Sequence, residues 1–122
     1  PLWGLEVYRL GFFIADITWD DTETLFKNPS TRGAADQIRR SLDGISANIA
    51  EGYRKRLYPK HFVSKMSDSD CECSETLVWL DFSKDCEYLT SSKYQELCQQ
   101  YSEVGRMLGF LINNPEKFAP RK

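Results

Sequence analysis

The stretch that decides the fold runs from Tyr94 to Leu111, YQELCQQYSEVGRMLGFL. Its apolar residues recur at intervals of three and four, a heptad seam that predicts a helix packed along other helices. Asn113-Asn114-Pro115 ends the pattern, so we predict a helix over residues 92–112. Thr90, or a capping box of Ser92 and Gln95, can begin it. The seam consists of Tyr94, Leu97, Tyr101, Val104, Leu108 and Leu111.

Three more helices are predicted upstream, over residues 5–19, 31–54 and 59–88. Ser30 or Thr31 can cap the second helix, and Pro59 suits the first turn of the third. Residues 20–31 are mostly polar and are expected to form a loop. The second helix should bury Ala34, Ile38, Leu42, Ile45, Ile49 and Gly52. The third should bury Phe62, Met66, Cys73, Leu77 and Leu80, with Ser69 or Asp70 between them.

Two of these helices carry a second apolar stripe, which one bundle core cannot cover. The sequence therefore predicts a homo-oligomer. On the first helix the stripes are Leu5, Tyr8, Phe12, Ala15 and Trp19, and Val7, Leu10, Ile14 and Ile17. On the third helix the second stripe is Trp79, Phe82, Cys86 and Leu89.

The fold class expected from these elements is all-α, an antiparallel up-down-up-down four-helix bundle. A chain of 122 residues suits a single domain, which we expect to span residues 1–122, with residues 116–122 loosely held. The longest apolar runs are far too short for a membrane helix, and no signal peptide is apparent. We therefore expect a cytoplasmic protein whose cysteines, Cys71, Cys73, Cys86 and Cys98, are free thiols.

Residues for catalysis or metal binding are sparse. His61 is the single histidine and is expected on the surface, which leaves no Ser-His-Asp or Cys-His set. Cys71 and Cys73 would point about 200° apart on a helix, too far to grip one metal ion. We therefore predict no enzyme activity, cofactor, metal site or small-molecule substrate.

A basic run is the main candidate for a binding site. It comprises Arg54, Lys55, Arg56 and Lys60, with Lys65 following, and the formal net charge of the whole chain is −2. It is either a solvated helix end or a site for nucleic-acid phosphates. Arg39 and Arg40 would add to it if they share its face. The acidic residues that follow, Asp68, Asp70, Glu72 and Glu75, would repel RNA on the same surface.

A polar pair lies within the apolar second helix. Asn48 and Glu51 are flanked by alanines and Ile49, so we expect both to make defined hydrogen bonds. Arg54 and Arg40 are the candidate partners of Glu51. Gly44 in the same helix is expected to permit close helix packing.

The run Ser46-Ala47-Asn48-Ile49-Ala50-Glu51-Gly52-Tyr53, preceded by Gln37-Ile38-Arg39-Arg40-Ser41, resembles proteins encoded in the intervening sequences of bacterial 23S ribosomal RNA genes. The resemblance spans nearly the whole chain, because further matches agree in order and spacing at residues 5–8, 62, 74–76, 79–82, 88–89 and 94–112. It implies an antiparallel four-helix bundle assembled as a homopentamer, with no known enzymatic activity. Asn48, Glu51 and Gly52 belong to its most specific motif. Glu87 stands where many members have glycine.

A related branch of this family is the accessory protein of diversity-generating retroelements, a basic pentamer that binds a reverse transcriptase and nucleic acid. The acidic balance of this chain departs from that branch. Two function classes follow from the resemblance: a scaffold associated with RNA or with a nucleic-acid-processing protein, or a protein-interaction scaffold that binds no nucleic acid. In both, the first partner is another copy of the chain.

Overall fold

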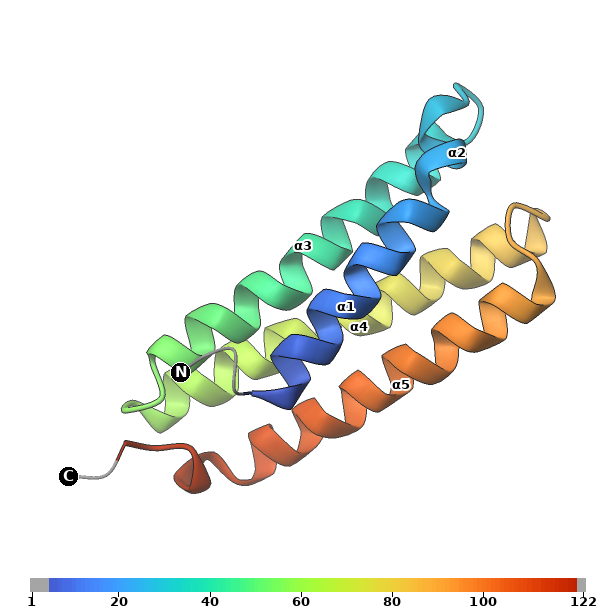
Figure 1. Cartoon of the computed structure of the whole chain (residues 1–122). Helices are drawn as coiled ribbons and strands as arrows, with labels where there is room; N and C mark the ends of the chain where they lie inside the picture. Colours follow the sequence, from blue (N-terminus) through green and yellow to red (C-terminus); the bar gives the residue numbers. More distant parts are fainter. Residues whose placement is uncertain (1–4, 121–122) are drawn as a thin grey trace.

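The computed structural model describes residues 5–120, and every regular element in this range is a helix. Four long helices lie side by side as a bundle (Figure 1), which confirms the all-α prediction. None of the described helices is both long and apolar enough to cross a bilayer. Residues 1–4, 121 and 122 of the predicted domain lie outside the described range. The elements are α1 (Glu6–Asp21), α2 (Glu23–Lys27), α3 (Arg32–Arg54), α4 (Pro59–Asp85), α5 (Ser91–Asn113) and the 3-10 turn η2 (Pro115–Lys117).

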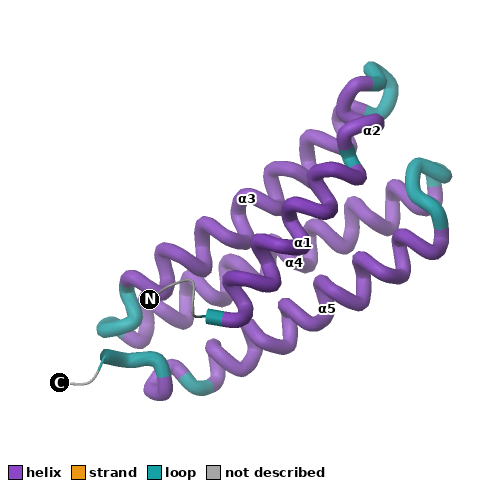
Figure 2. The backbone as a smooth tube through the Cα atoms, viewed as in Figure 1, coloured by secondary structure: helices purple, strands orange, loops and turns teal. Residues whose placement is uncertain are grey.

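The long helices form a four-cornered arrangement. Both α1 and α4 pack against α3 and α5, so α1 and α4 occupy opposite corners. The connection from α3 to α4 lies at the end of the bundle where α1 begins, and α2 lies at the other end with the connection from α4 to α5 (Figure 2). Each end of the bundle therefore brings together parts of the chain that are distant in the sequence.

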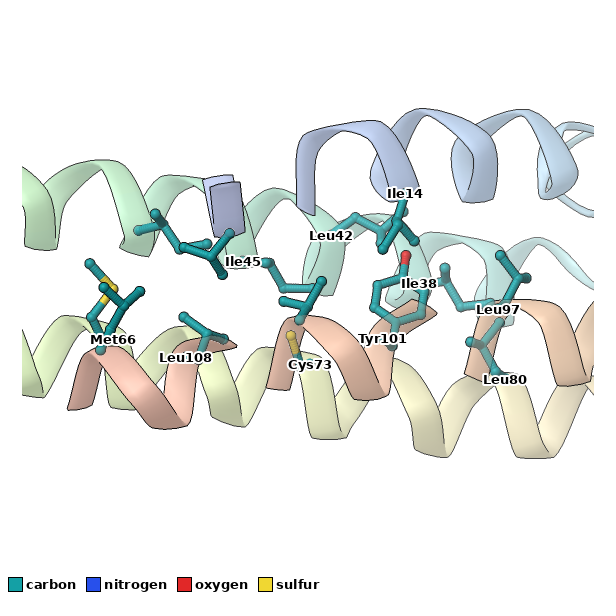
Figure 3. Close-up of a cluster of buried hydrophobic side chains, with 14 of the residues drawn as sticks. Ile14, Ile38, Leu42, Ile45, Met66, Cys73, Leu80, Leu97, Tyr101 and Leu108 are labelled. Carbon is teal, nitrogen blue, oxygen red and sulfur yellow. The ribbon is translucent and has the colours of Figure 1, made fainter. Parts of the chain in front are cut away.

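The core follows the stripes predicted for α3 and α5. All six predicted residues of α3 are buried, and so is the whole α5 seam except Tyr94, which is half-buried. Tyr101 reaches from α5 towards α1 and α3 (Figure 3), where its hydroxyl shares a 2.7 Å hydrogen bond with Thr18 Oγ1. On α4 the predicted core is confirmed at Phe62, Met66, Cys73 and Leu80.

Polar side chains complete the α4 face. Ser69, not Asp70, takes the middle position, and its hydroxyl donates to the Ile45 carbonyl at 2.8 Å. Thr76 is buried where the sequence predicted Leu77, and its hydroxyl donates to the Glu72 carbonyl at 2.9 Å. Both hydroxyls are satisfied by backbone carbonyls, so their burial carries little penalty.

The core uses one face of α1. Val7, Gly11, Ile14 and Thr18 point inward, whereas Phe12 and Trp19 are 52% and 41% exposed. A Cβ at Gly11 would lie 3.6 Å from Ile45 Cγ2, an ordinary van der Waals distance, so this face of α1 packs directly on α3. Leu5, Tyr8 and Ala15, of the same stripe as Phe12 and Trp19, are partly buried against the core, so only part of this stripe is on the surface of the chain.

Glycines let α3 and α4 approach closely. A Cβ at Gly52 would lie 2.9 Å from Lys65 Cβ and 3.1 Å from Met66 Cε. One at Gly44 would meet the flexible end of the Glu72 side chain at 2.8 Å. Because the end of the Glu72 side chain can move aside, close packing of the two helices is shown at Gly52, and the close packing expected at Gly44 stays a prediction.

The loop predicted over residues 20–31 is wrong in part. α1 continues to Asp21 and the short helix α2 follows, with Thr22 and Leu25 buried. Thr31 is the N-cap residue of α3, but its hydroxyl donates to the Leu25 carbonyl at 2.6 Å instead of capping the helix. This bond ties α2 to the start of α3.

α4 ends at Asp85, earlier than predicted, because Glu87 adopts a left-handed backbone with φ of 63°. The Glu87 amide donates to the Lys84 carbonyl at 2.9 Å, and the Tyr88 amide donates to the Ser83 carbonyl at 2.7 Å. These two bonds form a Schellman motif, in which glycine is the preferred left-handed residue. The geometry accounts for the glycine that the resemblance implies at this position. Thr90 is the N-cap of α5, and its hydroxyl accepts from the Lys93 amide at 3.1 Å.

The prediction that residues 116–122 are loosely held is wrong as far as residue 118, because this part of the segment packs against the bundle. After η2, the ring of Phe118 stacks on Phe62, with 6.0 Å between centroids, and meets Phe110 edge-on at 6.1 Å. Phe118 therefore covers the end of the core beside the start of α4.

Candidate nucleic-acid interface

The connection between α3 and α4 carries a cluster of cations, here called the basic corner and made of Arg54, Lys55, Arg56 and Lys60. Arg54 ends α3, and Pro59 at the first position of α4 supplies a fixed φ and lacks an amide hydrogen that would be unpaired there. Tight backbone bonds shape the connection, including Tyr58 N to Lys55 O at 2.8 Å. The cations are thus held within a short, ordered turn.

Most of the positive charge at the basic corner is uncompensated. Arg54, Lys55 and Lys60 are exposed, and none makes an ion pair with another residue of the described range. Arg56 turns back towards α3, where its guanidinium lies 4.2 Å from the Tyr53 ring centroid and donates to the Tyr53 carbonyl. Exposed cations of this kind are suited to phosphate contacts.

The pairing expected for Glu51 is wrong. Its carboxylate lies 3.4 Å from Lys65 Nζ on α4, and it bonds neither Arg54 nor Arg40. Lys65 also lies 3.8 Å from Asp68. Glu51 therefore does not neutralise the basic corner.

The hydrogen bonds expected of Asn48 are also absent. Its side chain is half-buried and makes no hydrogen bond with any residue in 5–120. Gly52, the third residue of this motif, has the packing role described above. The motif thus combines one residue fixed by packing with two polar groups directed away from the core.

Arg39 is corrected from a phosphate-contact candidate to a structural residue. It is 7% exposed, and its guanidinium lies 4.0 Å from the Trp19 ring centroid and 4.4 Å from that of Phe26. It donates to Thr22 Oγ1 at 3.1 Å, the Trp19 carbonyl at 3.2 Å and Glu23 at 3.1 Å. The Nε and Nη2 donors of this side chain therefore face the junction of α1 and α2.

Arg40 is exposed but separate from the basic corner. It pairs with Asp36 at 3.3 Å on the surface of α3. Arg54 follows fourteen residues later, roughly 21 Å along the helix axis at 1.5 Å per residue. The candidate set from the sequence therefore divides into the basic corner, a detached Arg40 and a buried Arg39.

The acidic stretch of α4 faces more than one neighbouring helix: Glu72 lies against Gly44 of α3, and Asp70 lies beside Gly105 of α5. The Glu72 side chain covers Gly44, and partial desolvation raises the pKa of its carboxyl, with nearby Glu75 and Asp68 acting in the same direction. Asp68 meets Lys65. The repulsion expected from this stretch thus falls mainly on the middle of the bundle.

The described residues contain no group of three or more histidine, cysteine or carboxylate side chains placed to hold a metal ion. Cys71 is exposed and Cys73 is buried on the opposite side of α4, and burial raises the pKa of the Cys73 thiol to about 12. His61 is exposed and meets Tyr58 edge-on, with centroids 6.2 Å apart.

A hollow beside the basic corner was missed from the sequence. It has a volume of about 550 Å³, and Tyr58 forms one wall. Tyr58 lies before Pro59 and outside the apolar stripes of the predicted helices, so the sequence pattern predicts no role for it. The hollow is lined by Ala47, Ala50, Glu51, Arg54, Lys55 and Tyr58.

Comparison with known families identifies the chain. The family model of the 23S rRNA-intervening sequence proteins matches residues 4–109. The chain belongs to this family. Membership of the 23S rRNA-intervening sequence proteins confirms the resemblance carried by residues 46–53, and the matched region includes the basic corner, the hollow and the whole of α3 and α4.

A solved structure is similar to this intervening-sequence protein. It is the crystal structure of a protein of unknown function from the S23 ribosomal protein family of Bacteroides thetaiotaomicron, with a TM-score of 0.81 and 24% sequence identity. The match covers 88% of this chain and 95% of that one. At this identity the likeness shows a shared fold. No curated protein sequence matches the chain.

Proposed function

We propose that this chain is a non-enzymatic scaffold, a homo-oligomer whose basic corner contacts the phosphates of RNA. The observation that carries the RNA contact is the group of cations at the α3–α4 connection that have no ion-pair partner among residues 5–120. Family membership among 23S rRNA-intervening sequence proteins agrees with a setting close to RNA. The chain would act as a single domain in the cytoplasm, an antiparallel up-down-up-down bundle, as its connections at alternate ends suggest.

Exposed aromatic surfaces support the oligomer. On α1, Tyr8 and Phe12 lie with ring centroids 6.1 Å apart and Trp19 is close to the same line of the helix. On α4, Phe82 contacts Trp79 at 5.8 Å and is 46% exposed. Apolar patches of this kind on a soluble chain mark association surfaces.

The positions of the two surfaces favour a ring. α1 and α4 occupy opposite corners of the bundle, so the α1 surface of one copy can meet the α4 surface of the next. Such a heterologous contact closes into a cyclic assembly when the rotation between copies fits. The proposal of five subunits comes from the family resemblance. A ring repeats the basic corner on every subunit, and several modest phosphate contacts then add through multivalency.

The oligomer is tested by light scattering. We expect wild-type protein at micromolar concentration to show five times the chain mass of 14.1 kDa. The double variant Phe12→Gln/Phe82→Gln should give a smaller species with an unchanged helical circular dichroism spectrum, because both side chains are exposed in the single chain. A monomeric wild type would refute the oligomer, and a dimer or tetramer would refute the number five.

The RNA contact is tested by replacing Arg54, Lys55 and Arg56 with alanine. Wild-type affinity for RNA should fall steeply with salt, and the triple variant should bind at least about tenfold more weakly at low salt. The magnitude of the slope of log affinity against log salt should decrease by about two to three, because each phosphate contact that is lost no longer releases its counterion on binding. Fluorescence anisotropy with a labelled RNA measures both quantities.

A matched variant separates local contact from net charge. Lys27, Lys84 and Lys93 lie at the other end of the bundle, and replacing them with alanine removes the same charge. This control should bind nearly as well as wild type. If wild type does not bind at low salt, or if both triple variants lose affinity equally, the basic corner is a solvated helix end. The alternative, a protein-interaction scaffold that uses the exposed aromatic surfaces, would then be favoured.

A further inference from the structure

The hollow beside the basic corner has three kinds of wall. Its lining residues are two alanines of α3, Ala47 and Ala50, the aromatic residue Tyr58, and three charged residues, Glu51, Arg54 and Lys55. Its volume of about 550 Å³ is within the range of small-ligand sites and is large enough for one nucleotide. A flat aromatic side next to cations is the arrangement by which proteins hold unpaired bases.

Tyr58 is held firmly at its backbone but leaves its ring in solvent. Its amide donates to the Lys55 carbonyl at 2.8 Å, and its carbonyl accepts from the Phe62 amide at 3.0 Å, as the N-cap residue of α4. The side chain is 56% exposed, and its ring contact is the edge of His61. An aromatic ring that contributes little to the core, on a rigid turn, is available for stacking.

The charge around the hollow is positive despite Glu51. That carboxylate is paired with Lys65 at 3.4 Å, whereas Arg54 and Lys55 have no ion-pair partner among residues 5–120. An anionic ligand is therefore attracted to Arg54 and Lys55, and Ala47, Ala50 and Tyr58 offer apolar surface to a flat ring.

We propose that the hollow binds one unpaired nucleotide of a single-stranded nucleic acid, with the base stacked on Tyr58 and the flanking phosphates on Arg54 and Lys55. The proposal rests on the proposed phosphate contact and specifies its substrate as single-stranded. In a duplex the bases are already stacked and paired, so their faces cannot reach Tyr58. Stacking is tolerant of sequence because every base has a π-face.

The test compares an unstructured single-stranded RNA, a DNA of the same sequence and an RNA duplex of the same length. Tyr58→Leu keeps an apolar side chain but removes the ring, and it should weaken single-strand binding by about 5- to 150-fold while leaving duplex binding unchanged. Tyr58→Trp keeps a stacking surface and should bind at least as well as wild type. RNA and DNA single strands should behave alike, because the proposed contacts are to bases and phosphates, which both contain.

Two further observations keep the outcomes distinct. Circular dichroism should be the same for all three proteins, and light applied to RNA containing 5-iodouridine should crosslink Tyr58, identified by mass spectrometry. If wild type binds no nucleic acid, the proposed function and this inference both fail. If wild type binds through Arg54, Lys55 and Arg56 but Tyr58→Leu loses nothing on single strands, or duplex binds more tightly, the stacking site is refuted and the phosphate contact stands.

Discussion

Replacement of Tyr101 by alanine is expected to lower the free energy of unfolding by about 3–5 kcal/mol, the cost typical of deleting a buried aromatic ring. Tyr101 is 1% exposed and lies in the α5 seam, with its ring among core side chains of α3 and α5 (Figure 3). Its loss would leave a cavity at the junction of α1, α3 and α5, since backbone on three sides limits relaxation. Urea unfolding followed by far-UV circular dichroism measures the change.

Tyr101→Phe is the matched control. It keeps the ring and removes the hydroxyl that bonds Thr18 Oγ1 at 2.7 Å. Thr18 still donates to the Ile14 carbonyl at 2.8 Å, so it is not left without a partner. The cost should be about 1 kcal/mol. Both variants are compared at one chain concentration, because assembly would add to apparent stability. A loss below about 1 kcal/mol for Tyr101→Ala would contradict the packing described for this region.

Arg39→Ala is expected to lower the free energy of unfolding by about 2–3 kcal/mol, the second largest effect. The variant loses two cation–π contacts and charge-assisted bonds to Thr22 and the Trp19 carbonyl. The pair with Glu23 adds little, because that carboxylate is half exposed and also pairs with Lys27. The loss should be largest around α2, so amide hydrogen exchange should accelerate over residues 22–31.

Arg40→Ala is the control on the adjacent residue. Arg40 is exposed and makes one surface ion pair, so its removal should change stability by no more than about 0.5 kcal/mol. Arg39→Lys keeps the charge but loses the planar fork that fits between Trp19 and Phe26, and should recover only part of the loss. If Arg39→Ala were fully stable yet bound RNA more weakly, the structural role assigned to Arg39 would be wrong.

The helices could be predicted because their signals are local. The α5 seam and the α3 stripe repeat every three to four residues, and this spacing by itself places them on one side of a helix. The basic corner was also visible, since consecutive cations before a proline mark a helix end whatever surrounds them. Family membership followed from the motif over residues 46–53, which is continuous in the chain.

Which apolar face of a helix turns to the core could not be predicted from local sequence. α1 has two apolar stripes, and the core takes the face of Val7 and Ile14, on which Thr18 meets Tyr101 across the bundle. The same limit applies to the candidate site. Tyr58 becomes one side of a hollow only when the α3–α4 connection folds back beside Ala47 and Ala50, which lie eight or more residues earlier in the chain.

By itself the sequence determined four long helices, their core-facing residues on α3 and α5, the family and the position of the basic corner. Only the tertiary structure decided the role of Arg39 and the existence of α2. From the sequence, Arg39 and Arg40 are equivalent cations in one helix. The fold separates them because Arg39 faces α1 and α2, where two aromatic rings and backbone oxygens from residues 19–26 surround its guanidinium, while Arg40 faces solvent. The segment over residues 20–31 has too few apolar residues to predict a helix. α2 forms there because side chains from α3 and its N-cap hold it: Arg39 bonds Thr22 and Thr31 bonds the Leu25 carbonyl.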